Sequence, residues 1–99
     1  MAFVTTNPEA LTTAAGSLQS IGSAVSAQNA AAAAATTGVV PAGSDEVSAL
    51  TAAQFGAHAQ LYQTLSAQAA AIHESFVNTL TTSSASYAAT EAANAVAAG

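Results

Sequence analysis

The sequence predicts an all-α protein: two long antiparallel helices, a helical hairpin, forming half of a four-helix bundle with a partner. Large apolar residues recur at helical spacing in two segments, and one Gly/Pro-containing break, TTGVVPAGSDE (36–46), separates them. Of the 99 residues, 30 are Ala and only 21 are Val, Ile, Leu, Met, Phe or Tyr. Because that supply of large side chains is too small for an independent core, we expect a partner chain to complete it.

The first helix is expected over about residues 8–37. Asn7 is a good N-cap, Pro8 suits the first helical position, and the charge of Glu9 complements the helix dipole. Gly22 flanks the apolar stripe and lets a second backbone come close. The large apolar side chains fall within an arc of about 80°, and they are Leu11, Leu18, Ile21 and Val25.

The second helix is expected over about residues 45–81, after a turn at about 38–44. Gly38 suits the end of the first helix and Ser44 is the expected cap of the second. The tail, about residues 82–99, is either a short helix or disordered. The apolar stripe of the second helix spans about 140°, wider than the first helix can cover. Its members are Val47, Leu50, Phe55, Leu61, Tyr62, Leu65, Ile72 and Phe76.

Composition argues against several classes of function. The chain has no Lys or Arg, so we expect no nucleic-acid partner. It has no Cys, and His58 and His73 lie about 22 Å apart along one helix, so we expect no metal site. His58 fits a hydrogen-bonded interface histidine. A hairpin offers no pocket for catalysis, and we expect neither an enzyme nor a cofactor.

The two ends of the chain raise the question of export. The N-terminal MAFVTTNPEA has neither the basic nor the apolar region of a Sec signal peptide, and no run of about 18 apolar residues predicts a membrane span. In the tail, Tyr87 and Glu91 are four residues apart, so a helix would place them on one face. Alone, this pair is a weak pattern.

The whole chain resembles the PE family of mycobacterial proteins. The resemblance rests on Pro8-Glu9 in TNPEAL, on AAAAATTGVVPAG at the turn, and on DEVSALTAAQF, SAQAAAIHESFVNTL and SSASYAATEAANA beyond it. It is most similar to short members linked to the fifth type VII (ESX) secretion system. The resemblance implies a heterodimer with a PPE protein, whose far tip an EspG-type chaperone holds, so that the chaperone meets this chain only indirectly.

The resemblance also implies export and a location outside the cytosol. The pair would leave through the type VII secretion ATPase and channel and be secreted or reach the cell envelope or cell surface. Tyr87 and Glu91 would be the secretion signal, with Glu where many members have Asp. The alternatives are a homodimeric four-helix bundle, a component of an outer-membrane nutrient-uptake assembly, or an enzyme or small-molecule carrier. Mass measurement of the purified chain would separate the homodimer from the heterodimer.

Overall fold

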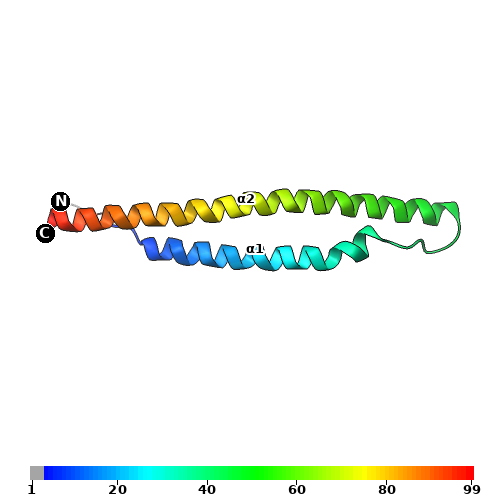
Figure 1. Ribbon diagram of the computed structural model, residues 1–99, viewed down its shortest axis with the longest axis horizontal. Coiled ribbons are helices and arrows are strands. Elements are labelled where there is room, and N and C mark those ends of the chain that lie inside the picture. Colours follow the sequence, from blue (N-terminus) through cyan, green and yellow to red (C-terminus); the bar gives the residue numbers. More distant parts are fainter. Residues whose placement is uncertain (1–3) are drawn as a thin grey trace. The chain divides into compact units, whose positions relative to one another are not determined.

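The computed structural model describes residues 4–99, which form two helices: α1, Pro8–Thr37, and α2, Glu46–Ala98 (Figure 1). The described residues contain no strand, and the prediction of an all-α fold with two long helices is confirmed. Contacts divide the chain into two compact units. Unit 1 joins the described residues up to Gly22 with His73–Gly99, and unit 2 is Ser23–Ile72. Within each unit, a segment of α1 pairs with an antiparallel segment of α2.

The ends of α1 follow the local sequence. Asn7 caps it as expected, because its Oδ1 accepts a hydrogen bond from the backbone N–H of Ala10 at 3.3 Å. At the other end, the N–H of Gly38 donates to the carbonyl of Ala34 at 3.1 Å. No glycine among the described residues has a positive φ, so α1 ends without a left-handed turn.

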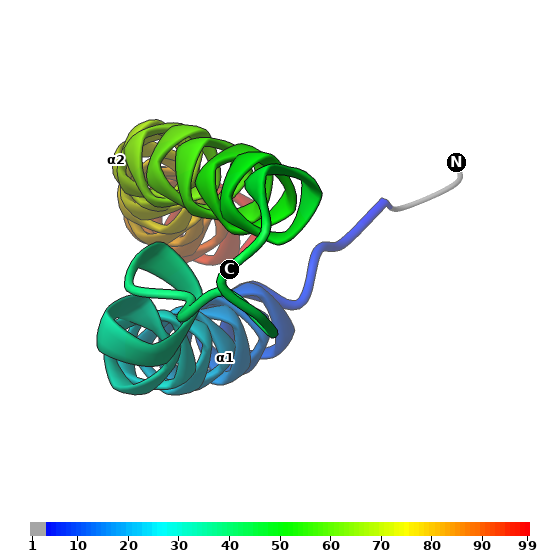
Figure 2. The same ribbon diagram turned by 90° about the vertical axis from the view of Figure 1, so that its right-hand side faces the viewer.

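The start of α2 corrects one expectation. Asp45 caps the helix in place of Ser44: its Oδ2 accepts from the backbone N–H of Ser48 at 2.9 Å, and its Oδ1 accepts from the Ser48 hydroxyl at 2.8 Å. These hydrogen bonds hold the pKa of Asp45 below its ordinary value, because they favour the charged carboxylate. In Figure 2, which faces the turn, the α1 and α2 segments of unit 2 lie side by side behind the connecting segment.

The end of α2 corrects a second expectation. The sequence predicts an end near residue 81, but the helix continues through the tail to Ala98. No Gly or Pro interrupts the sequence between Gly56 and Gly99. Two threonine hydroxyls near residue 81 bond to the helix itself: Thr79 donates to the carbonyl of Ser75 at 2.9 Å, and Thr81 donates to that of Val77 at 3.0 Å.

In unit 2 the helices meet through small and polar residues. We call the positions where α1 and α2 face each other the seam. On α2 the seam includes the buried residues Ala52, Gly56 and Ala59, spaced by four and three as in a coiled coil. A Cβ on Gly56 would lie 3.2 Å from the carbonyl oxygen of Thr37, so the backbones are close at that point. Asn29 adds two hydrogen bonds between the helices. Its side-chain Oδ1 accepts from the Tyr62 hydroxyl at 2.8 Å, and its backbone carbonyl accepts from Gln63 Nε2 at 3.0 Å.

In unit 1 the buried residues of the seam are Ala15, Val77 and Ser84. Here His73 Nε2 lies 2.6 Å from the carbonyl oxygen of Leu18. Because a carbonyl can only accept, Nε2 carries the hydrogen and donates it. Gly22 makes room for this ring: a Cβ there would lie 2.7 Å from His73 Cδ2. The sequence predicts that a second backbone comes close at Gly22, whereas the structure places the side chain of His73 there.

Candidate functional site

The large apolar side chains of unit 2 lie outside its seam. Phe55 is 62% exposed, Leu65 53% and Ile72 71%. On a helical wheel their stripe is centred well over 90° from the seam of the same helix. We call this surface the apolar face. Its residues are Val25 on α1 and Val47, Leu50, Phe55, Leu61, Tyr62, Leu65 and Ile72 on α2.

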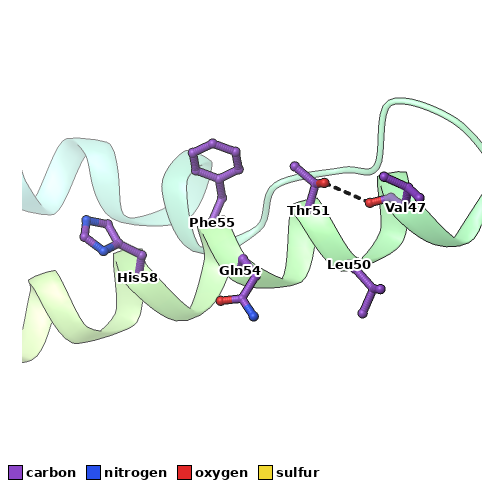
Figure 3. Close-up of a pocket in the computed structure, with 6 residues that line it drawn as sticks. All are labelled: Val47, Leu50, Thr51, Gln54, Phe55 and His58. Carbon is purple, nitrogen blue, oxygen red and sulfur yellow. Dashed lines mark hydrogen bonds between the residues drawn. The ribbon is translucent and has the colours of Figure 1, made fainter.

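The apolar face is shallowly hollowed near the start of α2 (Figure 3). All six lining residues come from that one helix. In the view, Leu50 and Gln54 project to one side of it, and Thr51 and Phe55 to the other. The Thr51 hydroxyl donates to the carbonyl of Val47 at 2.8 Å, so it is satisfied within the helix. The remaining lining residue is His58, for which the sequence predicts an interface position. A hollow on a single helix is suited to the side chains of a docking helix rather than to a small molecule.

Unit 1 exposes large apolar residues as well. Leu11 and Leu18 are half-buried, whereas Ile21 and Phe76 are more than half exposed. Tyr87, in the tail, is 46% exposed. The residues expected at an interface therefore lie on the surface of their own units or are only half covered by them. Their contact with a partner stays a prediction.

The tail of α2 pairs with the start of α1 in unit 1. Oε1 of Glu91 accepts two hydrogen bonds from Thr6, one from the backbone N–H at 2.8 Å and one from the hydroxyl at 2.9 Å. Two turns earlier, the buried Ser84 hydroxyl donates to the carbonyl of Pro8 at 2.7 Å and lies 2.7 Å from the hydroxyl of Thr12.

A groove runs over this junction, and it brings distant parts of the sequence together. Pro8 and Glu9, from the start of α1, line it together with Glu91 from the tail. Tyr87 and Glu91 differ in their surroundings. Tyr87 is exposed, whereas Glu91 is half-buried and lies seven residues beyond the seam residue Ser84. The two side chains expected to act together are thus one exposed ring and one anchored carboxylate.

Sequence reasoning missed the seam of α2 and the anchor of Glu91. The seam had a signal, the spacing 52, 56, 59, 63, 66 of small or polar residues. That spacing is easily overlooked because Ala and Gly also fill the rest of the helix. The contact between Thr6 and Glu91 had no signal, because 85 residues separate them.

Other site chemistries find no support in residues 4–99. They contain no group of three or more His, Cys, Asp or Glu side chains placed to bind a metal ion. Neither α1 nor α2 combines the length and hydropathy that crossing a bilayer requires.

The structure thus defines a helical hairpin protein in which small and polar residues join the helices of unit 2 and large apolar residues lie on the surface of that unit. The PE family model matches residues 4–94, and the chain belongs to the PE family. It is 65% identical to PE family protein PE13 of Mycobacterium tuberculosis (strain ATCC 25618 / H37Rv) over 98 residues, which cover 99% of each chain.

Longer relatives share the same region. The chain is 59% identical over 95 residues to the PE-PGRS family protein PE_PGRS8 of the same strain, covering 96% of this chain and 54% of that protein. It is 55% identical over 98 residues to PE family protein PE8, also of that strain, covering 99% of this chain and 36% of that protein. The region that matches this chain is therefore common to proteins of very different total length.

Proposed function

We propose that this PE protein is a non-catalytic subunit that pairs with a PPE protein as a helical heterodimer and is exported by a type VII secretion system. The observation that carries the pairing is the apolar face. Its side chains are 49% to 73% exposed, while the residues that join α1 to α2 in unit 2 are small or polar. A stripe of large apolar side chains left exposed along a helix is typical of protein–protein contacts.

The energetics favour a partner. Among the described residues, no side chain is fully buried, and the buried apolar ones are Ala15, Ala52, Ala59 and Val77. Full burial of one Leu, Ile or Phe side chain contributes about 1.5–3 kcal/mol, compared with about 0.8 kcal/mol per CH2 group. Covering the apolar face would therefore add more hydrophobic stabilisation than the few buried apolar residues provide. Two further helices would complete a four-helix bundle.

Charge favours a heterodimer over a homodimer. The chain has a net charge of −5 and no Lys or Arg. A second copy would double that charge and bring no Lys or Arg to pair with it, so like charges would oppose self-association. A different chain can bring basic groups. In the proposed pathway the PPE partner also carries the EspG-type chaperone, and Tyr87 and Glu91 are read by the secretion ATPase and channel on the way to the envelope or the outside.

Co-purification with candidate PPE proteins tests the pairing. Leu65→Asp places a charge in the middle of the apolar face, where an unpaired buried charge is strongly unfavourable. We expect the variant to lose the complex. Thr64→Asp is the matched control: it adds the same charge at the neighbouring exposed position, about 100° around the helix, and should retain the complex. Equal recovery of both variants with the partner would contradict the proposal.

A further inference from the structure

The carboxylate of Glu91 is held by the segment that precedes α1. Both donors of Thr6, the backbone N–H and the hydroxyl, converge on Oε1 at 2.8 and 2.9 Å. Hydrogen bonds to a charged acceptor are about twice as strong as neutral ones. A backbone donor and a side-chain donor from one residue fix the position of the oxygen, and Glu91 is half-buried where they meet it.

The start of α1 positions Thr6 beside the Glu91 carboxylate. Ser84 donates to the carbonyl of Pro8 at 2.7 Å, which ties the first turn of α1 to α2 seven residues before Glu91. Asn7 caps that turn, so the backbone between Thr6 and Pro8 is defined. The Pro-Glu start of α1 therefore sets the position of the donors that hold Glu91.

The two hydrogen bonds from Thr6 bring no positive charge to the Glu91 carboxylate. Thr6 contributes neutral donors, and the chain has no Lys or Arg that could pair with a carboxylate. Both donors bind the same oxygen, so Thr6 does not use Oε2. The contact thus orients the Glu91 carboxylate toward a cationic group of another molecule. The ring of Tyr87, which is 46% exposed, lies one helical turn away.

We propose that Thr6 is a positioning residue of the export signal: it fixes the Glu91 carboxylate relative to Tyr87, so that the secretion machinery reads a surface composed of Thr6, the start of α1 and the tail of α2. This proposal rests on the proposed role of Tyr87 and Glu91. It predicts that the signal depends on a residue 85 positions away in the sequence.

Export of variants, co-expressed with the partner in a mycobacterium that has a working type VII system, tests the proposal. Thr6→Val keeps the size of the side chain but removes the hydroxyl donor. We expect it to lower the exported fraction about fivefold, the factor that corresponds to about 1 kcal/mol. Thr6→Ser restores the donor and should restore export. Thr5→Val is the matched control at the neighbouring exposed position and should leave export unchanged.

Three further measurements distinguish a role of Thr6 in the signal from a purely structural role and from failure of the proposed function. Tyr87→Ala and Glu91→Ala should each block export, and normal export of both would overturn the proposed function itself. If they block export but Thr6→Val is exported normally, only the role of Thr6 is wrong. Partner co-purification should be unchanged in Thr6→Val, and loss of the complex would make the contact structural and overturn the proposal. Hydrogen exchange at the Thr6 amide should accelerate in Glu91→Ala, and an unchanged rate would contradict the contact.

Discussion

Replacing Gly22 by Ala should destabilise the protein although it improves helix propensity. In an ordinary helix interior, Ala is about 1 kcal/mol more favourable than Gly. At this position the new Cβ would lie 2.7 Å from His73 Cδ2 and 2.8 Å from Nε2. Real Cβ atoms do not approach other heavy atoms so closely, so the imidazole ring has to move.

The loss of unfolding free energy depends on the hydrogen bond that the His73 ring makes. His73 Nε2 donates to the carbonyl of Leu18 at 2.6 Å, and a displaced ring loses this hydrogen bond, worth about 1 kcal/mol. Overpacking of a close helix contact costs about 1–3 kcal/mol more. After subtracting the gain in propensity, we expect Gly22→Ala to lower the free energy of unfolding by about 1–3 kcal/mol.

Gly16 provides the matched control on the same helix. A Cβ at Gly16 would meet nothing within 4 Å. Gly16→Ala should therefore realise only the gain in propensity and raise the free energy of unfolding by up to about 1 kcal/mol. The two Gly→Ala changes are chemically identical and are expected to differ in sign.

Urea unfolding followed by circular dichroism measures both changes. One protein concentration is used throughout, because association adds to apparent stability. The double variant with His73→Ala isolates the pair: without the ring, Gly22→Ala should no longer be destabilising. If Gly22→Ala alone stabilises the protein as much as Gly16→Ala does, the close contact between α1 and His73 is wrong.

Two further predictions concern Ser84 and Asp45. Ser84→Ala removes the buried hydroxyl that donates to the carbonyl of Pro8 and should cost about 1–3 kcal/mol in urea unfolding. Ser86→Ala, at an exposed position of the same segment, should be nearly neutral, and equal effects would contradict the assignment. Hydrogen bonds from Ser48 lower the pKa of Asp45, so its contribution to stability is complete above the unfolded value of about 3.9 and is lost as the pH falls through the folded value. In Asp45→Asn this part of the acid dependence of the melting temperature should disappear, and an unchanged profile would assign the dependence to other carboxylates.

Much of the fold can be predicted from local signals in the sequence. Asn7 and Pro8 predict where α1 begins, because a cap and an N-terminal proline act within one turn. The recurring large apolar residues of the second segment predict a helix, with an arc too wide for α1 to cover. The exposure of Leu65 and Ile72 agrees with that reasoning.

Other features of the fold depend on contacts between distant residues, which periodicity and helix propensity do not predict. The run TTSSAS suggests that the second helix weakens near residue 81. However, no Gly or Pro follows before Gly99, and Ser84 holds this segment against the start of α1, so α2 continues. In the sequence, Ser84 is one more weak helix former. Its importance comes from the carbonyl of Pro8, 76 residues earlier, and only the structure places the two together.

The separation of small seam residues from large outward residues makes folding and partner binding distinguishable. Ala52, Gly56 and Ala59 bring the helices of unit 2 together, and enlarging any of them would push α1 and α2 apart. Leu61, Leu65 and Ile72 contribute little to that contact, because more than half of each side chain is exposed. Changes in the seam should therefore reduce folding and pairing together, whereas changes on the apolar face should reduce pairing first. In the proposed pairing, a hairpin arranged in this way offers its large exposed hydrophobic groups to a second chain and needs only a small core of its own.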